Sequence, residues 1–216
     1  MSKLPIIIAA VILGAFAVGG VGLVAVTHEL TNERIAANER AATLRKVAAI
    51  LPIERMDNDP LEDLIEVSNP DLLGAQVTRV YRIRNAGQPV ALVLNPIVPD
   101  GYAGPIKLLV SILSDGTLGG VRVLAHRETP GLGDKIEVAK SDWVLDFNGK
   151  SLANPTETGW KVKRDGGVFD QFAGATITPR AIVKTVLNSL LFVRQQGAVL
   201  YEQPAMAAAL QEKEES

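Results

Sequence analysis

The sequence predicts an α+β protein, in which one N-terminal transmembrane helix precedes a domain built from an antiparallel sheet and packed helices. Three observations favour this fold class: a long uncharged segment at the amino end, four β-type segments joined by short turns, and helical patterns after the last of them. We therefore divide the chain into an anchor (residues 1–27), a membrane-proximal helix and linker (28–70), a domain (71–196) and a C-terminal tail (197–216).

The anchor is predicted from length and charge. From Leu4 to Val26 the chain carries no charged residue, and a helix of about 20 apolar residues is long enough to cross a bilayer. The apolar core of a cleaved signal peptide has about 7–15 residues, so this segment favours a retained anchor over a signal peptide. Lys3 precedes the segment, and the basic residues after it are interleaved with acidic ones. A count of positive charges slightly favours a cytoplasmic domain, but the excess is small and charge alone does not decide which way the domain faces.

The four β-type segments form two pairs with hairpin spacing. Each pair is separated by a short turn rich in Asn, Asp or Gly, which predicts antiparallel neighbours. The predicted strands are residues 75–84, 89–95, 106–114 and 118–128. Helices are expected at 31–51 (ended by Pro52), at 134–147 and at 179–196, with a short strand and a loop at 159–172.

The composition excludes several classes of function. The 22 basic and 24 acidic side chains nearly cancel and form no basic stripe, which argues against a nucleic-acid partner. The chain has no cysteine, so disulfides, thiolate metal sites and cysteine nucleophiles are excluded. His126 and Glu128 have a spacing seen at metal sites, but no further ligand follows from the pattern. We predict no catalytic residue and no metal site.

The stretch "DQFAGATITPRAIV", residues 170–183, is the main candidate site. Thr178 and Pro179 are typical of a helix start, as the N-cap and the first helical residue, which leaves Thr176 just outside the helix amino terminus. Unpaired backbone N–H groups there favour an anion, so the stretch suits a phosphate at or near Thr176. The alternative is an ordinary helix-capping loop. Basic residues that could add positive charge are Lys161, Lys163, Arg164, Arg180 and Lys184.

A second stretch, "HRETPGLGDKI" at residues 126–136, predicts a tight loop between a strand and a helix. Gly131 and Gly133 flank Leu132, an arrangement that can present backbone and one apolar side chain to a flat ligand. Its glycine spacing is not that of a dinucleotide-binding fold.

Taken in order behind the anchor, the motifs "DGYAGPIKLLV", "HRETPGLGDKIE", "SDW", "KRDGG" and "FDQFAGATITPRAIV" closely resemble the G subunit of the Rnf (Rsx) electron transport complex. They are more distantly similar to the C subunit of the sodium-translocating NADH:quinone reductase. The resemblance extends from the anchor to about Val193. It implies FMN joined through its phosphate to a threonine hydroxyl by a separate flavin transferase.

The resemblance also assigns site residues. The family pattern of Asp, two variable residues, Ser or Thr, Gly, Ala and Thr maps the acceptor to Thr176, although Ala173 stands where a hydroxyl is usual. Within this motif we expect Asp170, Gly174 and Ala175 to take part in cofactor binding. We further expect Thr129, Gly131 and Leu132 to line the flavin ring, Glu128 to be a polar partner and Tyr102 to stack.

The implied function is that of a membrane-anchored flavoprotein that relays electrons between ferredoxin and a nicotinamide pool, within a complex that translocates an ion. The chain would be a carrier without turnover of its own, in the bacterial inner membrane, with its flavin domain in the periplasm. Other membrane subunits and iron–sulfur subunits would be its partners. The alternatives are a non-redox anchored binding or scaffold module, and a flavin subunit of a different membrane redox or regulatory system.

Overall fold

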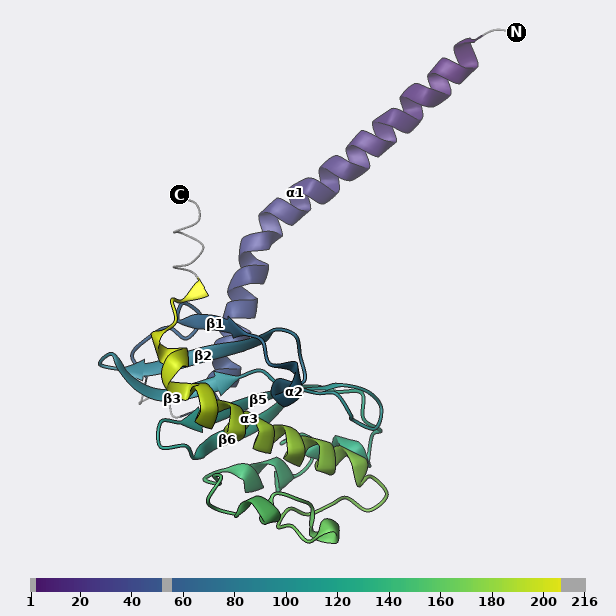
Figure 1. Ribbon diagram of the computed structural model, residues 1–216. Helices are drawn as coiled ribbons and strands as arrows, with labels where there is room; N and C mark the ends of the chain where they lie inside the picture. Colours follow the sequence, from purple (N-terminus) through teal and green to yellow (C-terminus); the bar gives the residue numbers. More distant parts are fainter. Residues whose placement is uncertain (1–2, 52–55, 207–216) are drawn as a thin grey trace. The chain divides into compact units, whose positions relative to one another are not determined.

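The computed structural model describes residues 3–51 and 56–206, which fall into two compact units, Met1–Thr43 and Leu44–Ser216. A single helix, α1 (Leu4–Ala48), makes up the first unit and continues into the second (Figure 1). It merges the two helices predicted for this part of the chain. Pro52, predicted to end the second of them, and most of the predicted tail (207–216) lie outside the described residues. No helix in the described part of the chain combines the length and apolar character that a bilayer crossing demands.

The second unit is built on a six-stranded sheet in which every pairing is antiparallel, as the turn spacing predicts. Its path runs β1–β2–β3–β5, with β4 beside the start of β5 and β6 on the other side of β5. The strands are β1 (Leu64–Val67), β2 (Thr78–Asn85), β3 (Gln88–Leu94), β4 (Ile97–Val98), β5 (Ile106–Leu113) and β6 (Leu118–Ala125). The four predicted strands are thus confirmed, and β1 comes from a segment predicted as linker.

The two faces of the sheet carry separate cores, because successive residues of a strand point to opposite sides. One core packs β-strand residues such as Leu92 and Val110 against the long C-terminal helix α3 (Ile177–Glu202), which lies across that face (Figure 1). The other core packs Val47, Ile50 and Leu51 against strand residues of the opposite face. The strand residues of this second core are Tyr81, Ile83, Ala91, Val93 and Leu109.

Close packing of Ile50 is possible because β6 has glycine at the contact. A Cβ atom on Gly120 would lie 3.3 Å from the Ile50 Cβ, closer than nearly all real contacts of this kind. Arg122 of the same strand donates a hydrogen bond from Nη2 to the Ala49 carbonyl over 3.0 Å. The segment that follows α1 is therefore part of the core of the second unit.

Helix α3 is longer than the predicted 179–196 and ends against two arginines of β2. Arg82 is buried, pairs with Asp63 and donates from Nη1 to the carbonyls of the last turn. Arg84 pairs with the same Asp63 (Nε to Oδ2, 2.7 Å). The carbonyls held by the two guanidinium groups are those of Leu200, Tyr201 and Gln203. Positive charge at this end of a helix is favourable, because the macrodipole is negative there.

The segment between β6 and α3 corrects two predictions. The helix expected at 134–147 is instead two 3₁₀ helices, η2 (Gly133–Ile136) and η3 (Asp142–Phe147), because Ser141 interrupts the pattern and accepts a hydrogen bond from the Trp143 N–H over 3.2 Å. The strand expected within 159–172 is a single bridge between Val162 and Phe169. Around it lie η4 (Glu157–Gly159) and η5 (Lys163–Asp165), and a short helix α2 (Pro70–Leu73) follows β1.

Candidate cofactor site

Two loops and the first turn of α3 meet at the buried carboxyl group of Glu128. Its Oε2 accepts a hydrogen bond from the Thr178 hydroxyl over 2.5 Å, and its Oε1 accepts one from the Ala103 N–H over 3.1 Å. Thr178 belongs to the first turn of α3, and Ala103 belongs to the loop between β4 and β5. Both oxygens of Glu128 are thus used inside the protein, and its predicted role as a polar partner of the flavin ring stays a prediction.

Two glycines make room for this carboxyl group. A Cβ on Gly133 would lie 2.8 Å from Glu128 Oε2, and a Cβ on Gly101 would lie 3.0 Å from Oε1. A side chain at Gly133 would require the carboxyl group to move, and one at Gly101 would also meet the Gly104 carbonyl oxygen at 2.2 Å. The two glycines of the "GLG" motif therefore have different roles. Gly133 allows close packing, whereas Gly131 supplies the left-handed backbone of the turn, with φ of +78°.

His126 positions the backbone of Glu128. Its Nδ1 accepts a hydrogen bond from the Glu128 N–H over 3.0 Å. An Nδ1 that accepts carries no proton in neutral imidazole, so Nε2 carries it and donates to Glu137 Oε1, 2.8 Å away. The spacing of His126 and Glu128 is therefore explained by hydrogen bonding within the loop.

Thr176 lies immediately before α3, outside the helix as the sequence predicts, but at the N-cap position that the prediction gave to Thr178. Its side chain is half-buried and makes no capping hydrogen bond, so the hydroxyl does not cap the start of the helix. Gly174 adopts a left-handed conformation with φ of +78°, and a Cβ placed on it would lie 3.6 Å from Leu132 Cδ2. The predicted acceptor and the predicted ring-lining loop are therefore neighbours, although they lie more than 40 residues apart in sequence.

The prediction that Thr178 caps the helix is wrong. The helix begins at Ile177, so Thr178 and Pro179 lie inside its first turn. Thr178 is completely buried, and its hydroxyl points to Glu128 instead of to a helix N–H. Pro179 is tolerated there because the first N–H groups of a helix have no partner within it.

Three exposed apolar residues lie next in sequence to the residues at this meeting point. Tyr102, Leu132 and Ile177 are 67%, 44% and 48% exposed, and each is next in sequence to a residue that contacts Glu128. The prediction included Tyr102 and Leu132 but did not include Ile177. Thr129 is also exposed, and its carbonyl accepts hydrogen bonds from the Leu132 and Gly133 N–H groups, both over 3.1 Å.

The segment that leads to Thr176 is held by an aromatic cluster. The Trp143 indole donates a hydrogen bond from Nε1 to the Asp170 carbonyl over 2.8 Å, and its ring meets that of Phe172 edge-on at 5.2 Å. The cluster continues through Phe147, Phe169 and Trp160. Both tryptophans are buried, as expected of core residues.

The basic residues predicted near the phosphate are partly engaged with carboxylates. Lys163 lies 2.7 Å from Asp170 Oδ1, and both side chains are exposed. Arg180 binds Asp165 through Nε and Nη2, at 2.5 and 2.7 Å. Hydrogen bonding from Arg180, with further attraction from Arg164 and Lys161, lowers the pKa of the Asp165 carboxyl group below its ordinary value.

The chain matches two known family models and several known proteins. Residues 101–191 match the FMN-binding domain, and residues 1–50 match the RnfG N-terminal region. The chain is 51% identical over 184 residues to the G subunit of the ion-translocating oxidoreductase complex of Pseudomonas aeruginosa (strain UCBPP-PA14), covering 85% of this chain and 86% of that protein. The corresponding G subunits of Vibrio cholerae serotype O1 (strain M66-2) and Shewanella amazonensis are 47% and 45% identical over 194 residues. The alignments cover 89% of this chain in both cases, and 92% and 90% of those proteins.

The chain belongs to the family of G subunits of ion-translocating oxidoreductase complexes. Within this G subunit, the FMN-binding match contains both loops and the helix turn that meet at Glu128, and it contains Thr176. The match ends at residue 191, within α3.

Proposed function

We propose that this chain is the flavin-carrying subunit of an ion-translocating oxidoreductase complex, and that it holds FMN through a phosphoester to Thr176. The observation that carries the proposal is the hydroxyl of Thr176, which is not used as a helix cap and stands beside an open, glycine-containing loop. When bound, FMN supplies the electron chemistry, so that the protein relays electrons between neighbours in the complex. Membership of the G subunit family and the FMN-binding match support this proposal.

The residues around Thr176 have separate tasks in this proposal. Gly174 and Ala175 leave space for the phosphate, and the unpaired N–H groups of the first turn of α3 favour its negative charge. The exposed Tyr102, Leu132 and Ile177 offer apolar contacts to the ring. A covalent tether keeps the ring near these contacts at an effective concentration of roughly millimolar, even where the contacts alone are weak.

Glu128 acts on the site indirectly. Its side chain is only 4% exposed, so it offers almost no surface to a ligand. It joins two loops and the first turn of α3 through Thr178, Ala103 and the close approach of Gly133. Thr129 and Gly131 then set the turn that presents Leu132. We therefore assign Glu128 the role of a positioning residue for the ring-lining loops.

The proposal includes a membrane location. The uncharged run from Leu4 to Val26 is long enough for one crossing, and the match to the RnfG N-terminal region begins at residue 1. We propose a single crossing of the bacterial inner membrane with the flavin domain in the periplasm. The partners are membrane and iron–sulfur subunits of the same complex, and a flavin transferase that attaches the cofactor.

The attachment is tested by co-expressing the chain with a flavin transferase and examining the denatured protein for flavin fluorescence on a gel. Fluorescence persists through denaturation in the wild type and is absent in Thr176→Ala. The control Thr178→Val removes the other hydroxyl of the segment and keeps the fluorescence. Peptide mapping locates the added mass at residue 176. A colourless wild-type band under these conditions would refute the flavin attachment and favour the scaffold module.

A further inference from the structure

His126 joins two segments of the candidate site through the two nitrogens of its ring. Nδ1 accepts a hydrogen bond from the Glu128 N–H over 3.0 Å, and Nε2 lies 2.8 Å from Glu137 Oε1. The bond to Glu128 spans two residues, as in an Asx turn, where an Asn or Asp side-chain oxygen accepts from the N–H two positions later. In this loop, the acceptor is a nitrogen that can gain a proton.

The two contacts of the ring respond to protonation in opposite ways. A backbone N–H can only donate, so a proton on Nδ1 would set two donors against each other and remove the bond to Glu128. The contact with Glu137 would persist and would become a bond between opposite charges, which is stronger than a neutral one. Protonation therefore keeps His126 attached to Glu137 and releases Glu128.

Glu137 is the charged group in direct contact with the ring. Among the described residues, the other charges on neighbouring segments are exposed or already engaged. Lys107, on the strand paired with the end of β6, and Arg127, the next residue in the chain, are both exposed, so water screens their charges. Asp134 of η2 lies 3.9 Å from Lys140.

We propose that the protonation state of His126 controls the loop at residues 128–133, which is held while the imidazole is neutral and released when Nδ1 gains a proton. This loop carries Leu132 and brings Gly133 against the Glu128 carboxyl group. Its release therefore loosens the apolar contact that Leu132 offers to the flavin ring. The effect on the ring rests on the proposed function, whereas the control of the loop is a property of the chain alone.

The direction of the pH effect follows from proton binding. The closed loop, with the Glu128 N–H bonded to Nδ1, excludes a proton from that nitrogen, and the open loop accepts one. The closed form is therefore favoured at higher pH and loses stability as the pH falls through the range in which histidine titrates, about pH 5–8. Once the open form is protonated, each further unit of pH raises the ratio of open to closed loop about tenfold.

The ring of His126 can be observed alone, because the chain has two histidines and His28→Gln removes the other. The full-length protein in detergent, without flavin, is labelled with ¹⁵N-histidine and followed by NMR from about pH 8 to about pH 5. At the higher pH, the ring should be neutral with its proton on Nε2. As the ring becomes protonated, hydrogen exchange at the Glu128 N–H should accelerate.

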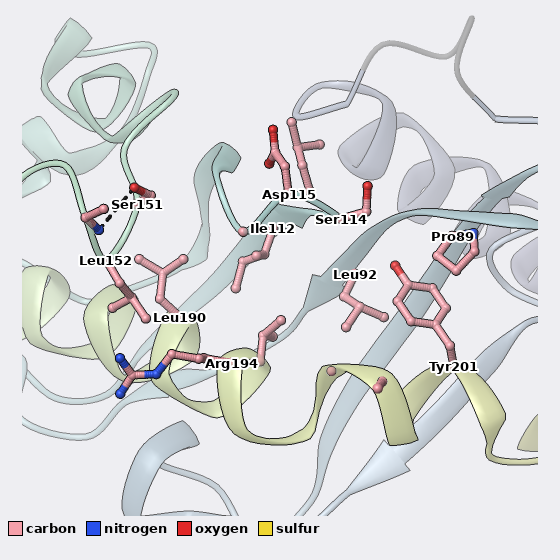
Figure 2. Close-up of a pocket in the computed structure, with 16 residues that line it drawn as sticks. Pro89, Leu92, Ile112, Ser114, Asp115, Ser151, Leu152, Leu190, Arg194 and Tyr201 are labelled. Atoms are coloured by element: carbon pink, nitrogen blue, oxygen red, sulfur yellow. Dashed lines mark hydrogen bonds between the residues drawn. The ribbon is translucent and has the colours of Figure 1, made fainter.

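An internal reference removes the ordinary pH dependence of hydrogen exchange. The Ala153 N–H donates to Ser151 Oγ over 3.2 Å, with the same two-residue spacing but an acceptor that does not titrate in this range (Figure 2). Both residues line a groove of about 610 Å³ beside the C-terminal half of α3 (Figure 2). Relative to this reference, exchange at Glu128 should rise about tenfold or more over the titration.

Two variants separate protonation from a merely structural role of the side chain. His126→Asn keeps an acceptor at the same spacing that cannot gain a proton, so exchange at Glu128 should follow the Ala153 reference at every pH. Glu137→Gln keeps an oxygen acceptor for Nε2 but removes its negative charge. The rise in exchange should therefore move to lower pH in Glu137→Gln, by about half a pH unit or more.

Three results would overturn the control of the loop by His126. They are a neutral ring with its proton on Nδ1, protonation of the ring without faster exchange at Glu128, and a rise in His126→Asn as large as in the wild type. A transition that stays at the same pH in Glu137→Gln would remove the role given to that carboxylate.

The effect on the flavin is measured on the chain co-expressed with a flavin transferase. Iodide should quench the flavin fluorescence more strongly at the acidic end of the titration in the wild type, whereas in His126→Asn the quenching should not change with pH. Equal quenching at both ends in the wild type would overturn the effect on the ring. A chain without covalent flavin would instead refute the proposed function and would leave the NMR and exchange results standing.

Discussion

Replacing Thr178 by valine tests whether Glu128 holds the site together. The change preserves the shape of the side chain but removes the hydroxyl that donates to Glu128 Oε2 over 2.5 Å. Thr178 is 0% exposed and Glu128 is 4% exposed, so water does not simply replace the lost donor. A hydrogen bond to a carboxylate contributes about 1.5–3 kcal/mol to stability. For a domain of this size, that loss lowers the melting temperature by about 3–12 °C.

The matched control is Thr78→Val on β2. Thr78 is 1% exposed, and its hydroxyl has no hydrogen-bond partner among the described residues. The same substitution there removes a buried hydroxyl that makes no hydrogen bond, so the free energy of unfolding should be unchanged or rise by about 1 kcal/mol. Both variants are compared with the wild type by thermal unfolding of the full chain in detergent. Equal losses in the two variants, or a Thr178→Val protein as stable as the wild type, would refute the role given to Glu128.

Three further predictions follow from the contacts described above. Arg180→Gln should raise the pKa of Asp165 towards its ordinary value near 3.8, as measured by NMR titration of the carboxyl carbon. In the wild type, the stabilisation from this pair is fully present above pH 3.8 and is lost as the pH falls through the lower pKa of the folded state. Ile50→Ala should cost about 2–4 kcal/mol in chemical unfolding, because a buried contact with the sheet is lost; a cost below 1 kcal/mol would show that residues 47–51 do not belong to the core. Thr158→Cys, at an exposed position, should react with a membrane-impermeant maleimide in cells whose outer membrane alone is permeabilised; reaction only after lysis would place the domain in the cytoplasm.

The sheet was predictable because its signals are local. Alternating apolar residues and turns such as Asn85–Gln88 predict each hairpin from one short continuous stretch, 78–94 in one case and 106–125 in the other, and all four predicted strands are present. Strand β1 was missed because it has only four residues, Leu64–Val67, too few for alternation to be recognised. The helix predicted at 134–147 failed because apolar spacing alone does not distinguish an α-helix from successive 3₁₀ turns.

The candidate site was predictable only in part. The tight loop at Gly131 and the position of Thr176 before α3 follow from local rules. The hydrogen bond between Thr178 and Glu128 joins residues 50 apart in sequence, so a local capping rule assigned the hydroxyl of Thr178 to the wrong partner. Ile177 was missed for a related reason, since its exposure depends on which side of the helix faces the sheet.

Helix α3 is fixed at both of its ends by side chains of opposite charge. The carboxyl group of Glu128 holds its first turn, and the guanidinium groups of Arg82 and Arg84 hold its last. Sliding the helix by one turn would break both sets of contacts at once, so it behaves as a spacer of constant length. Thr176 and Tyr201 are 25 residues apart along this helix, so as long as the helix keeps its position, changes near one end and changes near the other should be additive in their effects on the free energy of unfolding.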